Sequence, residues 1–297
     1  MPIEFFPAAE VFVGRDLGGR RTVASPADVD RYGDGTGDRH PWYTGDSPFG
    51  GPVAPALLYH SEVYRDLGWY LPNLIGNLHA KQEWDLFAPM PLGAPVRTRS
   101  TIVGRYRKRN RDYVVNEVLI TDDDGRWLQR SRTHQSFLAE HPVETGMVVD
   151  KDRERRDDRR FTLPDGPGER LASRTRTVTH AMCQAFSGPS RNYHTDVEMA
   201  QALGFPDIVV QGMMSVCFVA DALALRFGAG WQHGGALDVR LVNVVWPGDA
   251  ITTTGLVREV IPEGNRRRAV LDVWSTKADG TVTIIGTASA LEEIPHV

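Results

Sequence analysis

Two glycine turns recur along the 297-residue chain at one constant spacing. Gly93 and Gly248 are 155 residues apart, and Gly125 and Gly280 are separated by the same number. The first pair precedes strand-like segments, and each glycine of the second pair follows an aspartate in a turn sequence. A constant offset between two sets of features predicts that the chain contains one structural unit twice.

The two halves also share the order of their segments: a short polar helix, an apolar helical stretch and several β-rich segments. In the first half the apolar stretch follows residues 51–58 and ends at residues 66–69, and in the second it follows residues 207–214 and ends at residues 227–231. The helix expected at Met213–Leu225 is apolar nearly all round, which predicts burial on several sides. Strands are expected at residues 96–106, 251–260, 266–276 and 282–291.

These patterns predict an α+β fold in which each module is one long buried helix wrapped by an antiparallel sheet. Two such modules can join their sheets edge to edge, which covers strand edges that would otherwise be exposed. An entirely charged run at residues 150–160, followed by Pro and Gly, indicates a connector. We therefore expect a first module at residues 1–145, a charged linker at 146–172 and a second module at 173–297.

Composition excludes several classes of function. With 34 Lys and Arg against 38 acidic residues, the net charge of −4 excludes a polycationic nucleic-acid binder. Apolar runs fall short of the roughly 20 residues that cross a membrane, and the N-terminus lacks the pattern of a secretory signal. We expect a cytoplasmic protein without membrane partners, in which Cys183 and Cys217 are reduced core residues.

Residues 186–214 carry the most specific motif of the chain. Ser187-Gly188, His194-Thr-Asp196, Gly204-Phe205-Pro206 and Gln211-Gly212-Met213 occur in the order and nearly the spacing of the MaoC-like (R)-specific enoyl-CoA hydratase/dehydratase family, which this segment resembles. In the first half, Thr36–Tyr43 and Val53–Pro55 resemble the N-terminal, usually non-catalytic module of the double-hotdog hydratases. The resemblance implies a double hotdog, which is the fold expected from periodicity.

The resemblance also implies a substrate class. Members act on acyl thioesters of CoA or of an acyl carrier protein, without a metal or redox cofactor, and double hotdogs often pair further, so a homodimer is expected. A backbone N–H at the start of the central helix binds the thioester carbonyl, and Gly212 is the matching position. Helix N-termini offer unpaired donors where an oxyanion develops. Gly212 either lets the carbonyl approach closely or serves a close contact between helix and sheet.

This chain departs from the catalytic motif of the family at the position of the aspartate. The family sequence is Gly-Asp-x-Asn-Pro-x-His, whereas Gly188–His194 keeps the histidine and lacks the aspartate. If Asn192 aligns with the Asn of the motif, Ser190 stands at the Asp position. The first half shows the reverse, because it keeps Asp38 and places Tyr43 where the histidine belongs.

Four interpretations follow. Asp38 and His194 could form a composite dyad across the two modules, or His194 could hydrate or dehydrate an enoyl thioester with a substitute acid. We favour a third, thioester hydrolysis, in which neutral His194 is the base, Asn192 and Ser190 orient water, and the Gly212 amide stabilises the oxyanion. The fourth is a protein that binds acyl thioesters without turnover.

Further residues are candidates for contact with the substrate. Arg191 could bind a substrate carboxylate or a CoA phosphate, and the remaining candidates are Tyr193, Gln211, Asp38 and Trp42. Asp196 is expected to orient the loop. His180 and Cys183 have the spacing of zinc ligands, but no second pair completes a site, so no metal is expected.

Overall fold

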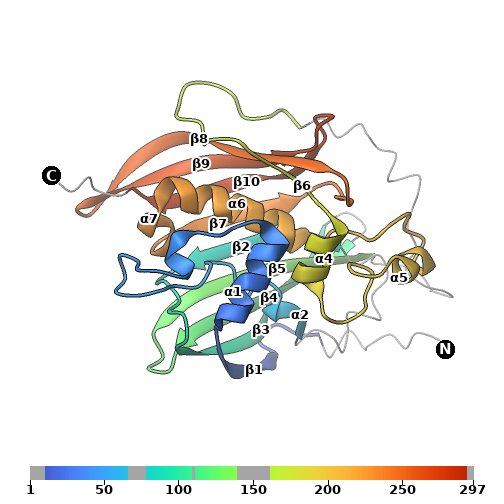
Figure 1. The fold of residues 1–297 in the computed structure, drawn as a ribbon, viewed down its shortest axis with the longest axis horizontal. Helices are drawn as coiled ribbons and strands as arrows, with labels where there is room; N and C mark the ends of the chain where they lie inside the picture. The colour runs from blue at the N-terminus through green and yellow to red at the C-terminus, as the bar shows by residue number, and fades with distance from the viewer. Residues whose placement is uncertain (1–10, 66–77, 109–110, 139–160, 293–297) are drawn as a thin grey trace.

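Ten antiparallel strands form one continuous sheet in the computed structural model, which describes residues 11–65, 78–108, 111–138 and 161–292. The strand order is β1-β3-β4-β5-β2-β7-β10-β9-β8-β6 (Figure 1). The first half contributes β1 (Asp16–Val23), β2 (Leu78–Leu86), β3 (Pro95–Lys108), β4 (Arg111–Asp122) and β5 (Trp127–Leu138). The second half contributes β6 (Arg174–Thr177), β7 (Ala236–Leu241), β8 (Ala250–Glu263), β9 (Arg266–Thr276) and β10 (Val282–Leu291).

The two halves join where β2 pairs with β7, through residues 81–85 and 236–240. The expected edge-to-edge union of two sheets is therefore confirmed. The 155-residue offset also holds in the strand register: Asn116 of β4 faces Thr133 of β5, and their counterparts Leu271 of β9 and Ala288 of β10 face each other. The duplication seen in the sequence is a duplication of structure.

The recurring glycines are explained by backbone geometry. Gly93 and Gly248 have φ angles of 79° and 93°, and Gly125 and Gly280 have φ angles of 83° and 86°. These angles lie in the left-handed region, where a Cβ atom would be strained and glycine is not. Each turn therefore requires glycine in both modules, and the repeat remains visible at these positions.

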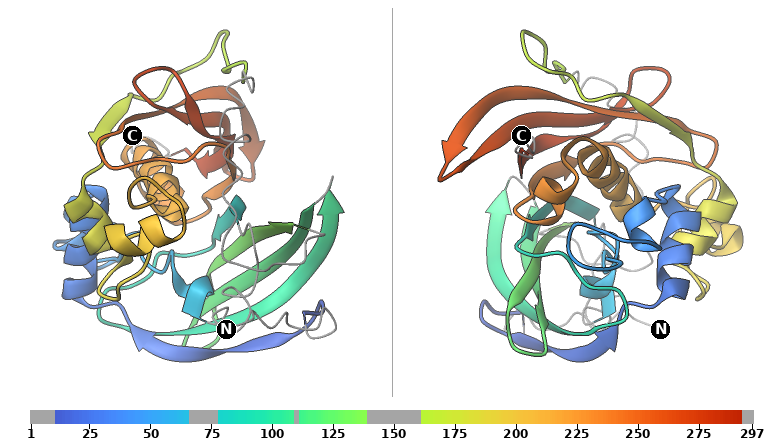
Figure 2. Two further views of the ribbon diagram at one scale, coloured as in Figure 1. Left: turned by 90° about the vertical axis from the view of Figure 1, so that its right-hand side faces the viewer. Right: turned by 60° about the vertical axis from the view of Figure 1, so that its left-hand side comes forward.

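The central helix of the second module is α6 (Gly212–Phe227), which lies in the concave side of the sheet (Figure 2). It packs against β8, β9 and β10. Its apolar residues are buried almost all round, as expected. The alternating residues of β9 that face it, Ala269, Leu271 and Val273, are fully buried. The predicted module of one wrapped helix is confirmed for this half.

The start of the apolar stretch in the first half differs from the expectation of a helix directly after residue 58. After α1 (Pro26–Thr36) and the 3-10 helix η2 (Pro41–Tyr43), residues 56–61 form successive turns, and α2 (Glu62–Arg65) extends to the last described residue of this segment. Tertiary contacts override the apolar pattern here, because the buried Glu62 carboxylate pairs with Arg20 of β1 at 2.7 Å and His60 stacks on Phe186. The expected helix end at residues 66–69 and the charged run at 150–160 lie outside the described residues.

The second module adds short helices around α6. They are α4 (His180–Ser187), α5 (Val197–Ala202) and α7 (Ala229–Gln232). In Figure 1, α4 lies beside α1 of the first module, with which it is in contact. Within the described residues, no helix combines the length and the apolar character that a bilayer-spanning segment requires.

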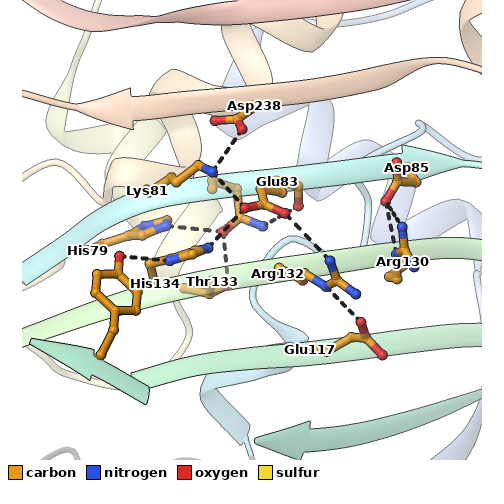
Figure 3. A network of polar contacts seen from close by, with 12 residues as sticks. His79, Lys81, Glu83, Asp85, Glu117, Arg130, Arg132, Thr133, His134 and Asp238 are labelled. Carbon is orange, nitrogen blue, oxygen red and sulfur yellow. Dashed lines mark hydrogen bonds and ion pairs between the residues drawn. The ribbon is translucent and has the colours of Figure 1, made fainter. Parts of the chain in front are cut away.

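A network of charged side chains ties the two modules together on the face of the sheet away from α6 (Figure 3). Lys81 of β2 contacts Asp238 of β7 at 2.8 Å and Glu83 at 2.7 Å. Glu83 also accepts a hydrogen bond from His134 of β5, and this bond, with Lys81, lowers the Glu83 pKa to about 2. Because the Lys81–Asp238 ion pair crosses the β2–β7 junction, it favours this register of the two sheets.

Candidate active site

His194 lies in the loop between α4 and α5, close to the start of the central helix. Its Nδ1 is 2.6 Å from the carbonyl oxygen of Val209, three residues before α6 begins. Because a carbonyl only accepts, Nδ1 carries the proton and Nε2 has the lone pair. Burial lowers the His194 pKa to about 4, although the Val209 carbonyl raises it. His194 is therefore a neutral base at neutral pH.

Asn192 holds this loop in shape. Its Oδ1 accepts the backbone N–H of His194 at 2.8 Å, and its Nδ2 donates to the carbonyls of Ser187 and Ser190 at 3.2 and 3.0 Å. Both amide donors are engaged, so one lone pair of Oδ1 is left for the water contact predicted from the sequence. The side chain of Ser190 is exposed. The water-positioning roles of Asn192 and Ser190 stay predictions.

Gly212 is the first residue of α6, so its N–H has no acceptor within the helix. Of the two reasons considered for a glycine here, the structure supports the close contact between helix and sheet. A Cβ at this position would lie 2.2 Å from Cδ2 of Leu241 in β7, so a side chain of the sheet fills the space that we assigned to an approaching carbonyl. A larger residue at this position would displace the Leu241 side chain. The oxyanion role of its N–H stays a prediction.

A second histidine, missed by sequence analysis, lies at the same helix end. His79 of β2 has its Nδ1 3.4 Å from the Cβ position of Gly212. Its Nε2 is 3.0 Å from Oε1 of Gln82, and that oxygen also accepts from Thr133. His79 therefore donates through Nε2 and offers the Nδ1 lone pair, which the Tyr64 hydroxyl approaches at 3.3 Å. Burial lowers the His79 pKa to about 4.

Each of the two histidines has a tyrosine beside it. The ring of Tyr193 lies 4.0 Å from the His194 ring, centroid to centroid. The hydroxyl of Tyr64 lies beside His79, and burial, with a smaller contribution from Tyr193, raises the pKa of Tyr64. Together His194, Tyr193, Tyr64, His79 and the Gly212 N–H form the candidate active site, which draws on both modules.

Gln211 and Arg191 border this site. Gln211 precedes α6 and is buried, and its Oε1 accepts from Ser187 at 3.1 Å and from Ser61 of the first module at 3.4 Å. Arg191 is exposed and binds the carboxylate of Asp196 at 2.5 Å. Asp196 also caps α5 by accepting the Met199 N–H, and it therefore orients the loop. A phosphate that binds Arg191 would compete with this ion pair.

Comparison with known proteins finds one matching family model and several solved structures with a similar fold. Residues 164–276 match the model of the MaoC-like domain. A MaoC-like dehydratase from Phytophthora capsici has a TM-score of 0.69 at 15% identity, covering 98% of this chain and 99% of that one. A Mycobacterium tuberculosis protein described as having a double hotdog fold has a TM-score of 0.63 at 12% identity, covering 95% and 96%.

A Lactobacillus plantarum protein provisionally named an oleoyl thioesterase has a TM-score of 0.52 at 12% identity, covering 95% of this chain and 97% of that one. No curated protein matches in sequence. The chain is a double-hotdog protein with a MaoC-like domain. This confirms the family resemblance and the fold predicted from the sequence.

The aspartate kept in the first hotdog module lies elsewhere. Asp38 is buried and accepts the Tyr43 hydroxyl at 2.8 Å. Burial, and then the charge of Asp221, raise its pKa well above the usual range for Asp. Asp221 is nine residues beyond Gly212 along α6, which is about 14 Å at the rise of an α-helix. These contacts give no support to a composite dyad of Asp38 with His194.

Trp42 belongs to the same part of the first module. Its ring contacts that of His40 at 4.5 Å and that of Phe49 at 6.0 Å, centroid to centroid. His40 accepts the Trp42 N–H, so it serves the turn at η2. Substrate contact by Trp42 or Asp38 stays a prediction. His180, the remaining zinc candidate, is exposed at the start of α4 and pairs with Asp207 at 3.0 Å.

A separate hollow of about 570 Å³ lies on the edge strand β1 and its neighbours β3 and β4. It is lined by arginines, and each has a carboxylate partner: Arg20 has Glu62, Arg99 has Asp16, and Arg21 and Arg97 share Asp123. Their charges are largely compensated, and the hollow is several strands from β2. It is therefore not part of the candidate site.

The packing of Gly212 gives a first prediction. Gly212→Ala should lower the free energy of unfolding by about 1–3 kcal/mol, because the new methyl group would displace Leu241. Gly212→Ala combined with Leu241→Ala should cost less than the sum of the single changes, since the second removes the atom in the way. Urea denaturation measures all three variants, and strictly additive costs would contradict this contact.

Proposed function

We propose that this protein hydrolyses acyl thioesters of CoA or of an acyl carrier protein. The observation that carries the proposal is the state of His194: a neutral imidazole with its proton on Nδ1 and its lone pair on Nε2, beside a helix N-terminus. Hydrolysis needs one base and one oxyanion donor. Hydration of an enoyl thioester needs, in addition, a second group that moves a proton at carbon.

The proposed reaction uses the residues as follows. The thioester oxygen accepts the Gly212 N–H, and water attacks the carbonyl carbon while His194 Nε2 takes its proton. The tetrahedral oxyanion is stabilised by the positive end of α6. The carbon–sulfur bond then breaks, and the departing thiolate receives the proton from His194. The products are one carboxylic acid and one thiol, and the histidine returns to its neutral form.

The loop position that carries an aspartate in the hydratase motif supports this choice. Ser190 stands there, and its side chain is exposed. The carboxylate next along the loop, Asp196, is engaged in capping α5 and in the ion pair with Arg191, both of which lower its pKa. Neither residue supplies the acid that the hydratase mechanism shares with the histidine.

Hydration or dehydration of an enoyl thioester is the second candidate. It is favoured by the match of residues 164–276 to the MaoC-like domain and by the Phytophthora capsici relative, which is named a dehydratase. In this chemistry His79 or the tyrosine pair would have to replace the missing acid. Both candidates keep the acyl thioester as substrate, His194 as base and Gly212 as donor.

Product analysis decides between the two. Purified protein is incubated with saturated, 2-enoyl and 3-hydroxyacyl thioesters of CoA, while free thiol is followed with a colour reagent and product masses by mass spectrometry. We expect free thiol and the liberated acid in equal amounts. Gain or loss of one water with the thioester intact would replace hydrolysis by hydration, and binding without any product would leave only a thioester-binding protein.

A homodimer and a cytoplasmic location, both expected from the sequence, stay predictions. Sedimentation analysis of the purified protein tests the first of them.

A further inference from the structure

The inner face of the sheet differs in chemistry between the two modules. In the second module, the positions beneath α6 on β7, β9 and β10 are apolar: Leu237, Leu271, Ile284, Ala288 and Ala290. The positions 155 residues earlier than these five are polar in the first module: Gln82, Asn116, Gln129, Thr133 and Gln135. Other positions of this face are apolar in both modules, since Trp84, Val114 and Val118 are the counterparts of Val239, Ala269 and Val273. The strand register confirms the equivalence, since Gln82 faces Thr133 just as Leu237 faces Ala288.

These polar side chains are inside the protein. Each of the five is at most 2% exposed, and the adjacent Ser100 of β3 is 1% exposed. Buried amide and hydroxyl groups destabilise a fold unless they are hydrogen-bonded. Oε1 of Gln129 and Oγ of Ser100 are buried without a hydrogen-bond partner in the part of the chain that the structure describes. The face therefore contains polar atoms whose hydrogen bonds are not made by other described residues of the protein.

The polar face is connected to the candidate active site. Thr133 donates to Gln82 at 2.8 Å, and the same oxygen of Gln82 accepts from His79, whose other nitrogen is near Gly212. Gln135 also lowers the pKa of Tyr64, which lies beside His79. A thioester carbonyl bound at Gly212 would therefore lie at one end of this face.

We infer that the acyl group of the substrate carries uncharged oxygen functions, hydroxyl or keto groups, and is not a plain hydrocarbon chain. This rests on the proposed site at Gly212 and His194. Amides and hydroxyls both donate and accept, so they suit hydroxyl and keto groups. The five side chains themselves carry no charge, and the buried Glu62 carboxylate of the first module is bound by Arg20 and Thr98. A site built to hydrogen-bond an oxygen rejects the analogue that lacks it.

Binding of S-(2-oxoalkyl)-CoA thioethers, which cannot be hydrolysed or hydrated at the thioester, tests the inference by calorimetry. Two ligands of equal chain length are compared, one saturated and one with hydroxyl groups along the chain. We expect the hydroxylated ligand to bind at least about tenfold more tightly, as one or two buried hydrogen bonds would give. Equal affinities, or tighter binding of the saturated ligand, would overturn the inference.

Variants locate the effect. Thr133→Val should lower the affinity ratio of the two ligands about fivefold or more, because it removes a hydroxyl from the polar face and keeps its shape. Thr253→Val is the matched control: Thr253 is equally buried on the inner face of the second module, where its hydroxyl meets Ser275 at 2.8 Å. The control should leave the ratio unchanged, and an equal shift in both variants would place the selectivity outside the polar face.

The two proposals fail separately. Hydrolysis of saturated thioesters without preference for the hydroxylated ligand would retain the function and overturn the inference. Preference for the hydroxylated ligand together with gain or loss of water as the reaction would retain the inference and overturn hydrolysis.

Discussion

His194→Ala is expected to lower kcat/KM for thioester turnover by about 10²–10⁴-fold, the usual contribution of a positioned general base. The fold should survive, because the imidazole makes one hydrogen bond, to Val209, in a loop between helices. Thiol release measures activity, and circular dichroism and urea denaturation measure the fold. His233→Ala is the control, since His233 lies beyond the far end of α6, at the end of α7, and should retain full activity.

The pH dependence of the same reaction tests the electrostatics. Burial lowers the His194 pKa to about 4, so the base stays neutral as the pH falls from 8 to 5 and is protonated only near pH 4. We expect kcat/KM to be flat over the upper range and to fall tenfold per unit below that pKa. A fall of kcat/KM that begins near pH 6.5 would show that the histidine is exposed to solvent and would contradict its burial.

Unchanged turnover in His194→Ala would show that His194 is not part of the active site.

The repeat was predictable because its turns depend on local backbone geometry. Each turn has a positive φ angle, which residues other than glycine adopt only at a cost in energy. Glycine is therefore found at all four positions, Gly93, Gly125, Gly248 and Gly280, and their spacing reveals the repeat. In the second module, β9 alternates with a period of two and the segments of β8 and β10 are rich in β-branched residues, so these three strands were also predictable.

The start of the helix expected after residue 58 in the first half was not predictable, because this stretch was assigned from its apolar composition. In the structure residues 56–61 form turns whose side chains are fixed by partners far away in the sequence, such as Phe186 against His60. Propensity and apolar pattern are weak where tertiary contacts on several sides fix the backbone.

The candidate site was half predictable. His194 belongs to a motif within one loop, so its spacing to Gly212 is visible in the sequence. His79 reaches the same helix end only because β2 joins β7 of the other module, and a lone histidine in a strand gives no sign of that pairing. The polar inner face has a sequence signal in retrospect: β5 alternates basic residues with neutral polar ones, so neither of its faces is apolar.

Arg176→Met is expected to lower the free energy of unfolding by about 3–5 kcal/mol, since it leaves a buried carboxylate without its nearest cation. The Arg176 guanidinium of β6 binds the carboxylate of Asp221, which is 3% exposed in the middle of α6. Asp38 lies against the same pair. Arg174→Gln is the matched control: Arg174 contacts Asp221 at 3.3 Å from a partly exposed position, so its loss should cost below about 1 kcal/mol.

The sign of the pH effect separates this explanation from a simple packing defect. The Asp38 pKa is already raised above its unfolded value, and Arg176 is one of the groups that hold it down. Removing Arg176 raises this pKa further, so the folded variant binds a proton that the unfolded chain releases. The difference in stability between wild type and Arg176→Met should therefore shrink as the pH falls from 8 towards 5. A difference independent of pH would indicate lost packing of Arg176 on the Phe218 ring, 5.0 Å away, as the main effect.

Arg176→Met combined with Asp221→Asn should regain most of the loss in the free energy of unfolding, because replacing both charges of a buried pair is often nearly neutral.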